Sequence, residues 1–146
     1  MLRGHATAKI DDKGRVKIPS EFLELFLSLC GEERRVFVTS RDGEMVLVYP
    51  LPVWEAHERK LAELPSTEPA VESYLRTVNF WGREAAIDAA GRVLVHPLLR
   101  ERAGIAGELS VFGKQNVLEI CTYEHFRVRP PTVTKDDLSR LAQYGV

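Results

Sequence analysis

Two short segments of this chain place an aspartate, a glycine and an arginine at the same spacing, and these residue types could carry its chemistry. The segments are residues 10–16 and 87–93, and five of their seven positions are identical. In both, the aspartate precedes the arginine by four positions and the glycine stands directly before the arginine. The residues are Asp11, Gly14 and Arg15 in the first copy and Asp88, Gly91 and Arg92 in the second.

This spacing is typical of a tight turn that its aspartate holds closed. A carboxylate in such a turn accepts hydrogen bonds from backbone N–H groups, and glycine adopts positive φ without a steric cost. The arginine returns beside the carboxylate and can form an ion pair. Its guanidinium has five donors, which one carboxylate cannot all use. The pattern therefore predicts a structural role for both aspartates and leaves both arginines with donors for a second partner.

Basic side chains gather around the first copy, although the whole chain has a net charge of −1. Residues 1–17 hold five basic and two acidic side chains, whereas residues 82–95 hold two of each. If the strands on either side of the first turn pair, Lys9 and Lys17 lie on neighbouring strands close to the turn. A twisted two-stranded ribbon of this kind fits the major groove of DNA.

DNA binding is therefore one interpretation of the basic cluster. Lysines would contact phosphates, which position a protein on DNA, and an arginine could pair with a guanine edge, which specifies the sequence. The alternative is a solvated charged face, and for Arg92 we leave DNA contact and structural pairing both open. The candidate DNA-binding residues are Arg3, Lys9, Lys13, Arg15, Lys17 and Arg92.

The two copies open two repeats of one larger unit. After each copy come a proline, an apolar run that ends at a glycine, two β-rich segments joined by a turn, and an aromatic residue that starts a helical pattern. The aromatic residue is Trp54 in the first repeat and Phe126 in the second. A unit of about fifty residues buries too little apolar surface to be stable alone. We therefore expect both repeats to share one core in a single pseudo-symmetric body.

The remaining segments divide the chain around these repeats. We predict a first repeat over residues 5–51, a helical insert over 52–79, a second repeat over 80–126 and a C-terminal tail over 127–146. Ser20 is expected to cap a helix that is apolar nearly all round, and such a helix is normally buried on more than one face. Thr134 is expected to cap a last short helix, which would dock either on its own chain or on a neighbour.

No pattern in the chain indicates catalysis. The histidines are far apart in sequence, and no nucleophile motif, glycine-rich phosphate loop or zinc spacing is present. Each turn aspartate has an arginine nearby that would hold it ionised, which argues against acid–base catalysis. We therefore expect no enzyme activity, no cofactor and no metal. The histidines considered are His5, His57, His96 and His125.

Cysteine usage and hydropathy point to the cytoplasm. Cys30 and Cys121 are too few for a disulfide framework and are expected to be buried, reduced thiols. The first residues lack the apolar segment of a signal peptide. No uninterrupted apolar stretch is long enough to span a membrane. These features predict a soluble cytoplasmic protein.

The chain resembles the MraZ family from residue 4 to near residue 126. The resemblance is carried by residues 4–19 with their Asp-x-x-Gly-Arg turn, by residues 47–54, and by the second copy over residues 88–97. It implies an α+β fold in which two tandem SpoVT/AbrB-like units form one pseudo-twofold, swapped-hairpin β-barrel with peripheral helices. The second copy departs from the first at Ala89 and Ala90, and the stretch after Phe126 matches less well.

The resemblance also implies a function and a place in the cell. It implies a bacterial transcription regulator that forms a ring-like homo-oligomer and binds double-stranded DNA through the basic Asp-x-x-x-Arg hairpin. The DNA sites would be direct repeats upstream of its own operon, the division and cell wall cluster, and the protein would be nucleoid-associated. The alternative is a ring-forming scaffold or protein-interaction module of the AbrB type, including an antitoxin-like unit that neutralises a partner.

Overall fold

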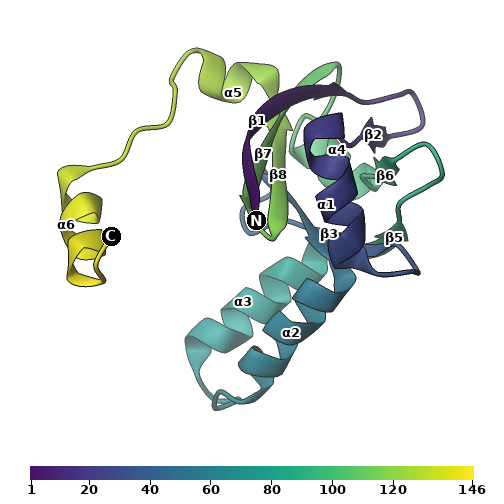
Figure 1. Ribbon diagram of the computed structural model, residues 1–146. Coiled ribbons are helices and arrows are strands. Elements are labelled where there is room, and N and C mark those ends of the chain that lie inside the picture. Colours follow the sequence, from purple (N-terminus) through teal and green to yellow (C-terminus); the bar gives the residue numbers. More distant parts are fainter.

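The computed structural model describes residues 1–146 and contains eight strands and six helices (Figure 1). The strands are β1 (Leu2–Lys9), β2 (Arg15–Lys17), β3 (Arg35–Thr39), β4 (Val46–Pro50), β5 (Arg83–Ala86), β6 (Arg92–Leu94), β7 (Glu108–Gln115) and β8 (Val117–Thr122). The helices are α1 (Ser20–Cys30), α2 (Leu51–Ala62), α3 (Pro69–Phe80), α4 (Pro97–Arg102), α5 (Tyr123–Arg127) and α6 (Lys135–Gln143). The predicted mixed α+β class is confirmed.

The strands form two antiparallel sheets in which the repeats exchange elements. The larger sheet has six strands in the order β1-β7-β8-β4-β3-β5, and the smaller one pairs β2 with β6. The first strand of each repeat therefore pairs with the other repeat, β1 with β7 and β5 with β3. The six-stranded order has two ends, β1 and β5, and the strand pairing does not include the closed barrel that the resemblance implies.

The strands on either side of the first turn do not pair with each other, so the condition for a two-stranded ribbon across this turn is not met. Lys9 and Lys17 do not lie on paired strands, because Lys9 pairs with Glu108 on β7 and Lys17 pairs with Arg92 on β6. Only a single bridge, between Ile10 and Val16, joins the two sides of the turn. The physical reason is that β1 pairs along all eight of its residues with β7, whereas β2 offers only three residues.

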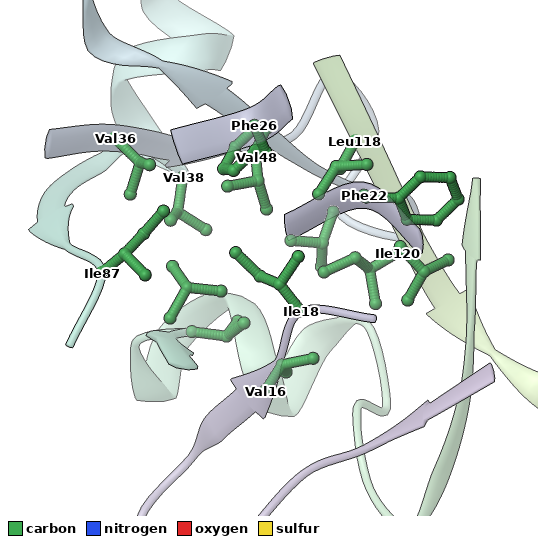
Figure 2. Packing of buried hydrophobic residues seen from close by; sticks show 14 of the residues in the cluster. Val16, Ile18, Phe22, Phe26, Val36, Val38, Val48, Ile87, Leu118 and Ile120 are labelled. Carbon is green, nitrogen blue, oxygen red and sulfur yellow. The ribbon is translucent and has the colours of Figure 1, made fainter. Parts of the chain in front are cut away.

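One hydrophobic core lies between the sheets and joins both repeats, which confirms the prediction of a shared core. The core cluster contains 19 buried residues from both halves of the chain. Figure 2 shows Val16 and Ile18 of the first repeat directed toward the same interior as Ile87, Leu118 and Ile120 of the second. Apolar burial is the main favourable contribution to folding, so the two repeats stabilise each other.

Helix α1 differs from its prediction in two respects. It buries one face, at Phe22, Phe26 and Cys30, while Leu25 remains 38% exposed, so it is not buried on several faces within one chain. Ser20 is the first helical residue and not the cap. Pro19 takes the capping position, with its carbonyl accepting from the N–H of Phe22 (2.9 Å), and no side chain caps the helix.

The insert between the repeats is a helical hairpin of α2 and α3, which projects from the body (Figure 1). Its base packs on the outer side of the larger sheet, where Phe37, Trp54 and Val78 form a second small cluster. The Phe37 and Trp54 rings stack with centroids 4.7 Å apart. The apolar side of α3 packs inward at Val71 and Val78, both of which are buried.

The C-terminal tail extends away from the body (Figure 1). Helix α6 begins after Thr134, whose side-chain oxygen accepts from the N–H of Asp137 (3.0 Å), so this predicted cap is confirmed. Every residue from 128 to 146 is exposed. Of the two docking alternatives, the structure therefore does not show α6 docked on its own chain. None of the helices combines the length and the apolar character that crossing a membrane requires.

Candidate nucleic-acid interface

The first Asp-x-x-Gly-Arg turn is closed by three hydrogen bonds to one carboxylate. Asp11 Oδ1 accepts from the backbone N–H groups of Lys13 (3.0 Å) and Arg15 (2.9 Å), and Oδ2 accepts from Arg15 Nε (2.8 Å). Gly14 has φ of 84°, which other residues rarely adopt. Its N–H donates to the carbonyl of Asp11 (3.1 Å). The turn is thus held by bonds within five consecutive residues.

The second turn repeats this geometry. Asp88 Oδ1 accepts from the N–H groups of Ala90 (3.0 Å) and Arg92 (2.8 Å), and Oδ2 accepts from Arg92 Nε (2.8 Å). Gly91 has φ of 77°. Both turns therefore have the same local geometry, closed by the same pattern of bonds from one aspartate.

Reciprocal hydrogen bonds lock the two turns side by side. The N–H of Val95 donates to the carbonyl of Gly14, and the N–H of Ile18 donates to the carbonyl of Gly91, both at 2.9 Å. Between them, β2 and β6 pair with Arg15 opposite Leu94 and Lys17 opposite Arg92. Both turns and this short ladder therefore form one rigid unit built from both repeats.

The outer side of this ladder is what we call the ribbon face. Val16 and Val93 are fully buried on the inner side, and because side chains alternate along a strand their neighbours point outward. The ribbon face consists of Arg15, Lys17, Arg92 and Leu94. The arginine side chains are 30% and 33% exposed, in sequence order, and Leu94 is 44% exposed.

Both turn aspartates are held in the ionised form. The pKa of Asp11 lies below its ordinary value, chiefly because its carboxylate accepts the backbone N–H of Arg15, and secondarily through the guanidinium, while partial desolvation opposes the shift. The pKa of Asp88 is lowered in the same way by Arg92. The carboxylates orient the guanidiniums through Nε. No hydrogen bond in the chain uses the Nη groups of Arg15, and Arg92 Nη1 lies 3.8 Å from Asp11 Oδ2.

Acid should loosen both turns over the same pH range. A depressed carboxyl pKa adds stability that is fully present above the unfolded pKa, about 3.9, and is lost as pH falls through the lower folded value. The urea midpoint should therefore hold steady from about pH 7 to 5 and fall below about pH 4. The Asp11→Asn/Asp88→Asn double variant should lose part of this acid dependence.

The matched control for this prediction is Asp12→Asn, because Asp12 is exposed and accepts no hydrogen bond in the turn. It should keep the acid profile of the unmodified chain. If the double variant also kept that profile, the turn carboxylates would not contribute to acid sensitivity.

The structure brings together four of the six predicted DNA-contacting residues. Arg15, Lys17 and Arg92 share the ribbon face, and Lys13 is exposed at the adjoining turn. Lys17 Nζ also donates to the carbonyl of Ala90 (2.9 Å), which ties it to the second turn. These positions create a compact cationic surface, as the DNA hypothesis requires.

The other two predicted contacts lie elsewhere along β1. Lys9 is exposed near the turn and pairs with Glu108. Arg3 pairs with Lys114 at the far end of the strand, and six residues of strand separate it from Lys9 by roughly 20 Å. The structure thus does not place Arg3 with the ribbon face.

Sequence reasoning missed two residues at this surface. Leu94 could have been found from alternation, since a buried Val93 requires outward neighbours on both sides. Arg100 on α4 lies so close to Gly14 that an added Cβ would overlap its guanidinium, and its Nη1 is 3.5 Å from the carbonyl of Val95. No sequence signal shows this contact, because it joins residues 86 positions apart that meet only through tertiary packing.

The histidines and acidic residues do not assemble into another site. His57 is hydrogen-bonded to the Tyr74 hydroxyl (2.8 Å), and His5 stacks on Phe112 with centroids 4.7 Å apart. No group of three or more His, Cys, Asp or Glu side chains is placed to hold a metal ion. The two turns and the ribbon face are therefore the candidate functional site.

Comparison with known proteins adds independent information about this chain. The family described as "MraZ protein, putative antitoxin-like" matches residues 1–77. A protein of Acidobacterium capsulatum named "Transcriptional regulator MraZ" is 38% identical over 148 residues, covering 100% of both chains. A Koribacter versatilis protein of the same name is 35% identical over 148 residues, again covering 100% of both. An Escherichia coli protein of that name is 34% identical over 120 residues, 82% of this chain and 78% of the relative.

Proposed function

This chain belongs to the MraZ family, and from that premise we propose that it is a transcriptional regulator that binds double-stranded DNA through its ribbon face. The observation that carries the proposal is the pair of interlocked turns, which present Arg15 and Arg92 on one face with their orientation fixed by carboxylates. Preorganised guanidiniums lose little entropy on pairing with a guanine edge. We call the unit formed by the two turns and the ribbon face the head. The exchange of first strands between the repeats supports a SpoVT/AbrB-like architecture of the head.

The distribution of charge supports a division of labour within the head. Lys13 and Lys17 are exposed amines beside the arginines and suit phosphate contacts, which give affinity without sequence preference. The arginines suit base edges, which give sequence preference. A leucine on the same face can contact a thymine methyl group.

The two halves of the head are equal in geometry but not in chemistry. The first turn has Lys13 where the second has Ala90, and Lys17 of the first repeat corresponds to Leu94 of the second. A symmetric head would suit a palindrome, because protein symmetry and site symmetry correspond. This unequal head instead suits a directional site. The asymmetry supports the direct-repeat form of the sites, which we propose to lie upstream of the division and cell wall operon of the protein.

We include self-association in the proposal because a single head offers few contacts to DNA. Four or so phosphate contacts would bind weakly and with strong salt dependence, whereas linked heads on repeated sites gain avidity without new contacts. We propose a ring-like homo-oligomer that acts at the nucleoid in the cytoplasm.

The direct test is a gel shift with DNA from upstream of the operon that encodes the protein, compared with scrambled DNA at several salt concentrations. We expect preferential binding to the upstream DNA and a loss of affinity as salt rises. Equal binding to both DNAs would contradict sequence-specific regulation, and no binding at low salt would contradict the DNA proposal altogether.

Lys13→Ala should weaken binding to every DNA sequence by a similar factor. Lys13 is exposed at the first turn and lies outside the paired strands β2 and β6. Its replacement should therefore remove one phosphate contact without disturbing the strand pairing. The slope of log affinity against log salt should become shallower by about one. The control is Lys60→Ala, which removes an exposed lysine from α2 in the projecting hairpin. A change of sequence preference without a change of slope would contradict the phosphate role.

A protein-interaction role is the second candidate, and the antitoxin-like wording of the family description favours testing it. An exposed Leu94 within a charged face is also compatible with a protein partner. Retention on heparin at low salt followed by the gel shift distinguishes the DNA-binding role from the protein-interaction role. A module that binds only proteins should neither be retained on heparin nor shift the upstream DNA.

A further inference from the structure

Helix α6 has an apolar side that nothing in its own chain covers. Leu138 is 55% exposed, Leu141 is 42% exposed and Tyr144 is 83% exposed, and their spacing places them along one side of the helix. A helix of nine residues is only marginally stable in water, even with a good cap. Its stability therefore requires packing of this apolar side against another surface.

The same chain has one apolar cavity over the outer side of β1 and β7 that is open to solvent. Its volume is about 320 Å³. Its floor is Phe112, which stacks on His5 with centroids 4.7 Å apart and meets the edge of Phe126 at 5.4 Å. Pro130 and Pro131 form part of its wall. Aromatic rings left half-exposed in this way offer a binding surface for aliphatic side chains.

The internal duplication identifies the part of the first repeat that is equivalent to this surface. Strands β4 and β8 come from different repeats and pair with Leu47 opposite Glu119 at the centre. The pairs on either side are Val46–Ile120 and Val48–Leu118, so the two strands are related by a pseudo-twofold axis through the central pair. Leu47 is therefore the counterpart of Glu119. Thr39 pairs with Leu47, and Phe112 pairs with Glu119, so Thr39 and Phe112 occupy equivalent places. The cavity over Phe112 thus corresponds to the surface over Thr39 in the first repeat.

In the first repeat a helix covers that surface. Val78 of α3 is fully buried in a cluster with Phe37 and Trp54, and its carbonyl accepts from Thr39 Oγ1 (2.6 Å). Trp54 is the fourth residue of α2, as Phe126 is the fourth residue of α5. The second repeat has the equivalent sheet surface and the equivalent aromatic helix, but no second helix that corresponds to α3.

We propose that α6 of one copy packs over this cavity on a neighbouring copy of the same chain. The occupant comes from another copy because the linker of residues 128–134 leads α6 away from its own cavity (Figure 1). Pro130 and Pro131 stiffen that linker, and an extended stretch of seven residues reaches roughly 20 Å. This inference rests on the self-association part of the proposed function.

One pair of charged groups could join the two surfaces, although α6 as a whole carries as many basic as acidic side chains. Arg3 and Lys114 face each other on β1 and β7, next to the pair His5–Phe112 and on the same side of the sheet. Lys114 binds Glu119 (3.1 Å), whereas no ion pair in the chain uses Arg3. The first turn of α6 carries Asp136 and Asp137. A neighbour's α6 would supply Arg3 with the carboxylate that its own chain does not.

The first test replaces the apolar side of α6 in the full-length chain. Leu138→Asp/Leu141→Asp should shift the species seen by light scattering to a smaller mass and weaken association at least tenfold. Ser139→Asp/Gln143→Asp adds the same charge to the polar side and should keep the mass of the unmodified protein. Figure 1 shows α6 apart from the body, so the body should fold in both variants, while the loss of association should lower the thermal midpoint of the first variant only.

The second test identifies the occupant. A copy with Leu141→Cys is mixed with a differently tagged copy with Tyr123→Cys, which lies at the cavity. A disulfide between the two copies supports the proposal, and Cys30 and Cys121 do not interfere because they are buried. No disulfide, or one that forms only when both substitutions are in the same chain, would overturn it.

The two proposals fail in different ways. If the unmodified protein associates and binds DNA while the α6 double variant keeps its mass, the exchange is wrong and the proposed function stands. If the unmodified protein is a monomer, both the exchange and the oligomeric part of the proposed function are wrong.

Discussion

Arg15→Ala should abolish the preference for upstream DNA over scrambled DNA. The side chain is held by Asp11 through Nε, while its Nη groups have no partner in the chain. A bidentate arginine–guanine pair contributes about 1–3 kcal/mol of discrimination. When several heads bind repeated sites together, the losses multiply through avidity. The measurement is a competition gel shift with both DNAs at one fixed salt concentration.

The fold should survive this substitution. Asp11 still accepts the backbone N–H groups of residues 13 and 15, and Arg92 Nη1 remains 3.8 Å from its Oδ2. Light scattering and thermal unfolding should therefore match the unmodified protein.

Two further variants complete this test. The first separates the charge of Arg15 from the geometry of its guanidinium, and the second examines the other turn. Arg15→Lys keeps the charge but not the planar fork, so it should retain non-specific affinity and lose most of the preference. Arg92→Ala removes the equivalent arginine of the second turn and shows whether that copy also reads bases. If Arg15→Ala kept full preference, the first turn would not be the sequence-reading element.

Phe26→Ala should be the most destabilising single substitution of the set. Phe26 is fully buried in the core cluster to which both repeats contribute (Figure 2). Removing a buried phenylalanine side chain costs about 3–5 kcal/mol, because transfer energy is lost and a cavity remains. Urea unfolding at fixed protein concentration measures this loss, since association also contributes to stability.

The adjacent residue provides the control. Leu25 is on the same helix but is 38% exposed, so Leu25→Ala should cost well below the Phe26→Ala value in the folded chain. Equal losses for the two would contradict a core centred on the inner face of α1. A loss for Leu25→Ala that grows with protein concentration would instead place Leu25 in the contact between copies.

The elements whose causes are local could be predicted from the sequence. The cap of α6 and the aspartate-closed turns follow from residues within a few positions of one another, and the structure shows both. Serine favours the N-cap position in general, which is why the sequence predicts Ser20 as the cap, but Ser20 is the first residue of the helix. Here the carbonyl of Pro19 already accepts the first helical N–H groups.

The partners of the strands could not be predicted in the same way. Alternation along β1 indicates which side chains face inward, but it does not say which strand lies alongside. In a duplicated chain each strand has two similar candidates. A hairpin of consecutive strands would pair Lys9 with the strand of Lys17, but β1 pairs with β7 and β2 pairs with β6.

The two Asp-x-x-Gly-Arg turns follow from local sequence, since their hydrogen bonds close within five residues and need nothing from the rest of the chain. Their position next to each other is a result of tertiary packing, because the bond from Val95 to Gly14 joins residues from different repeats. The same holds for Arg100 against Gly14 and for the outward position of Leu94 beside Arg15. Such long-range pairings are selected by the burial of one shared core, which depends on all the apolar residues at once.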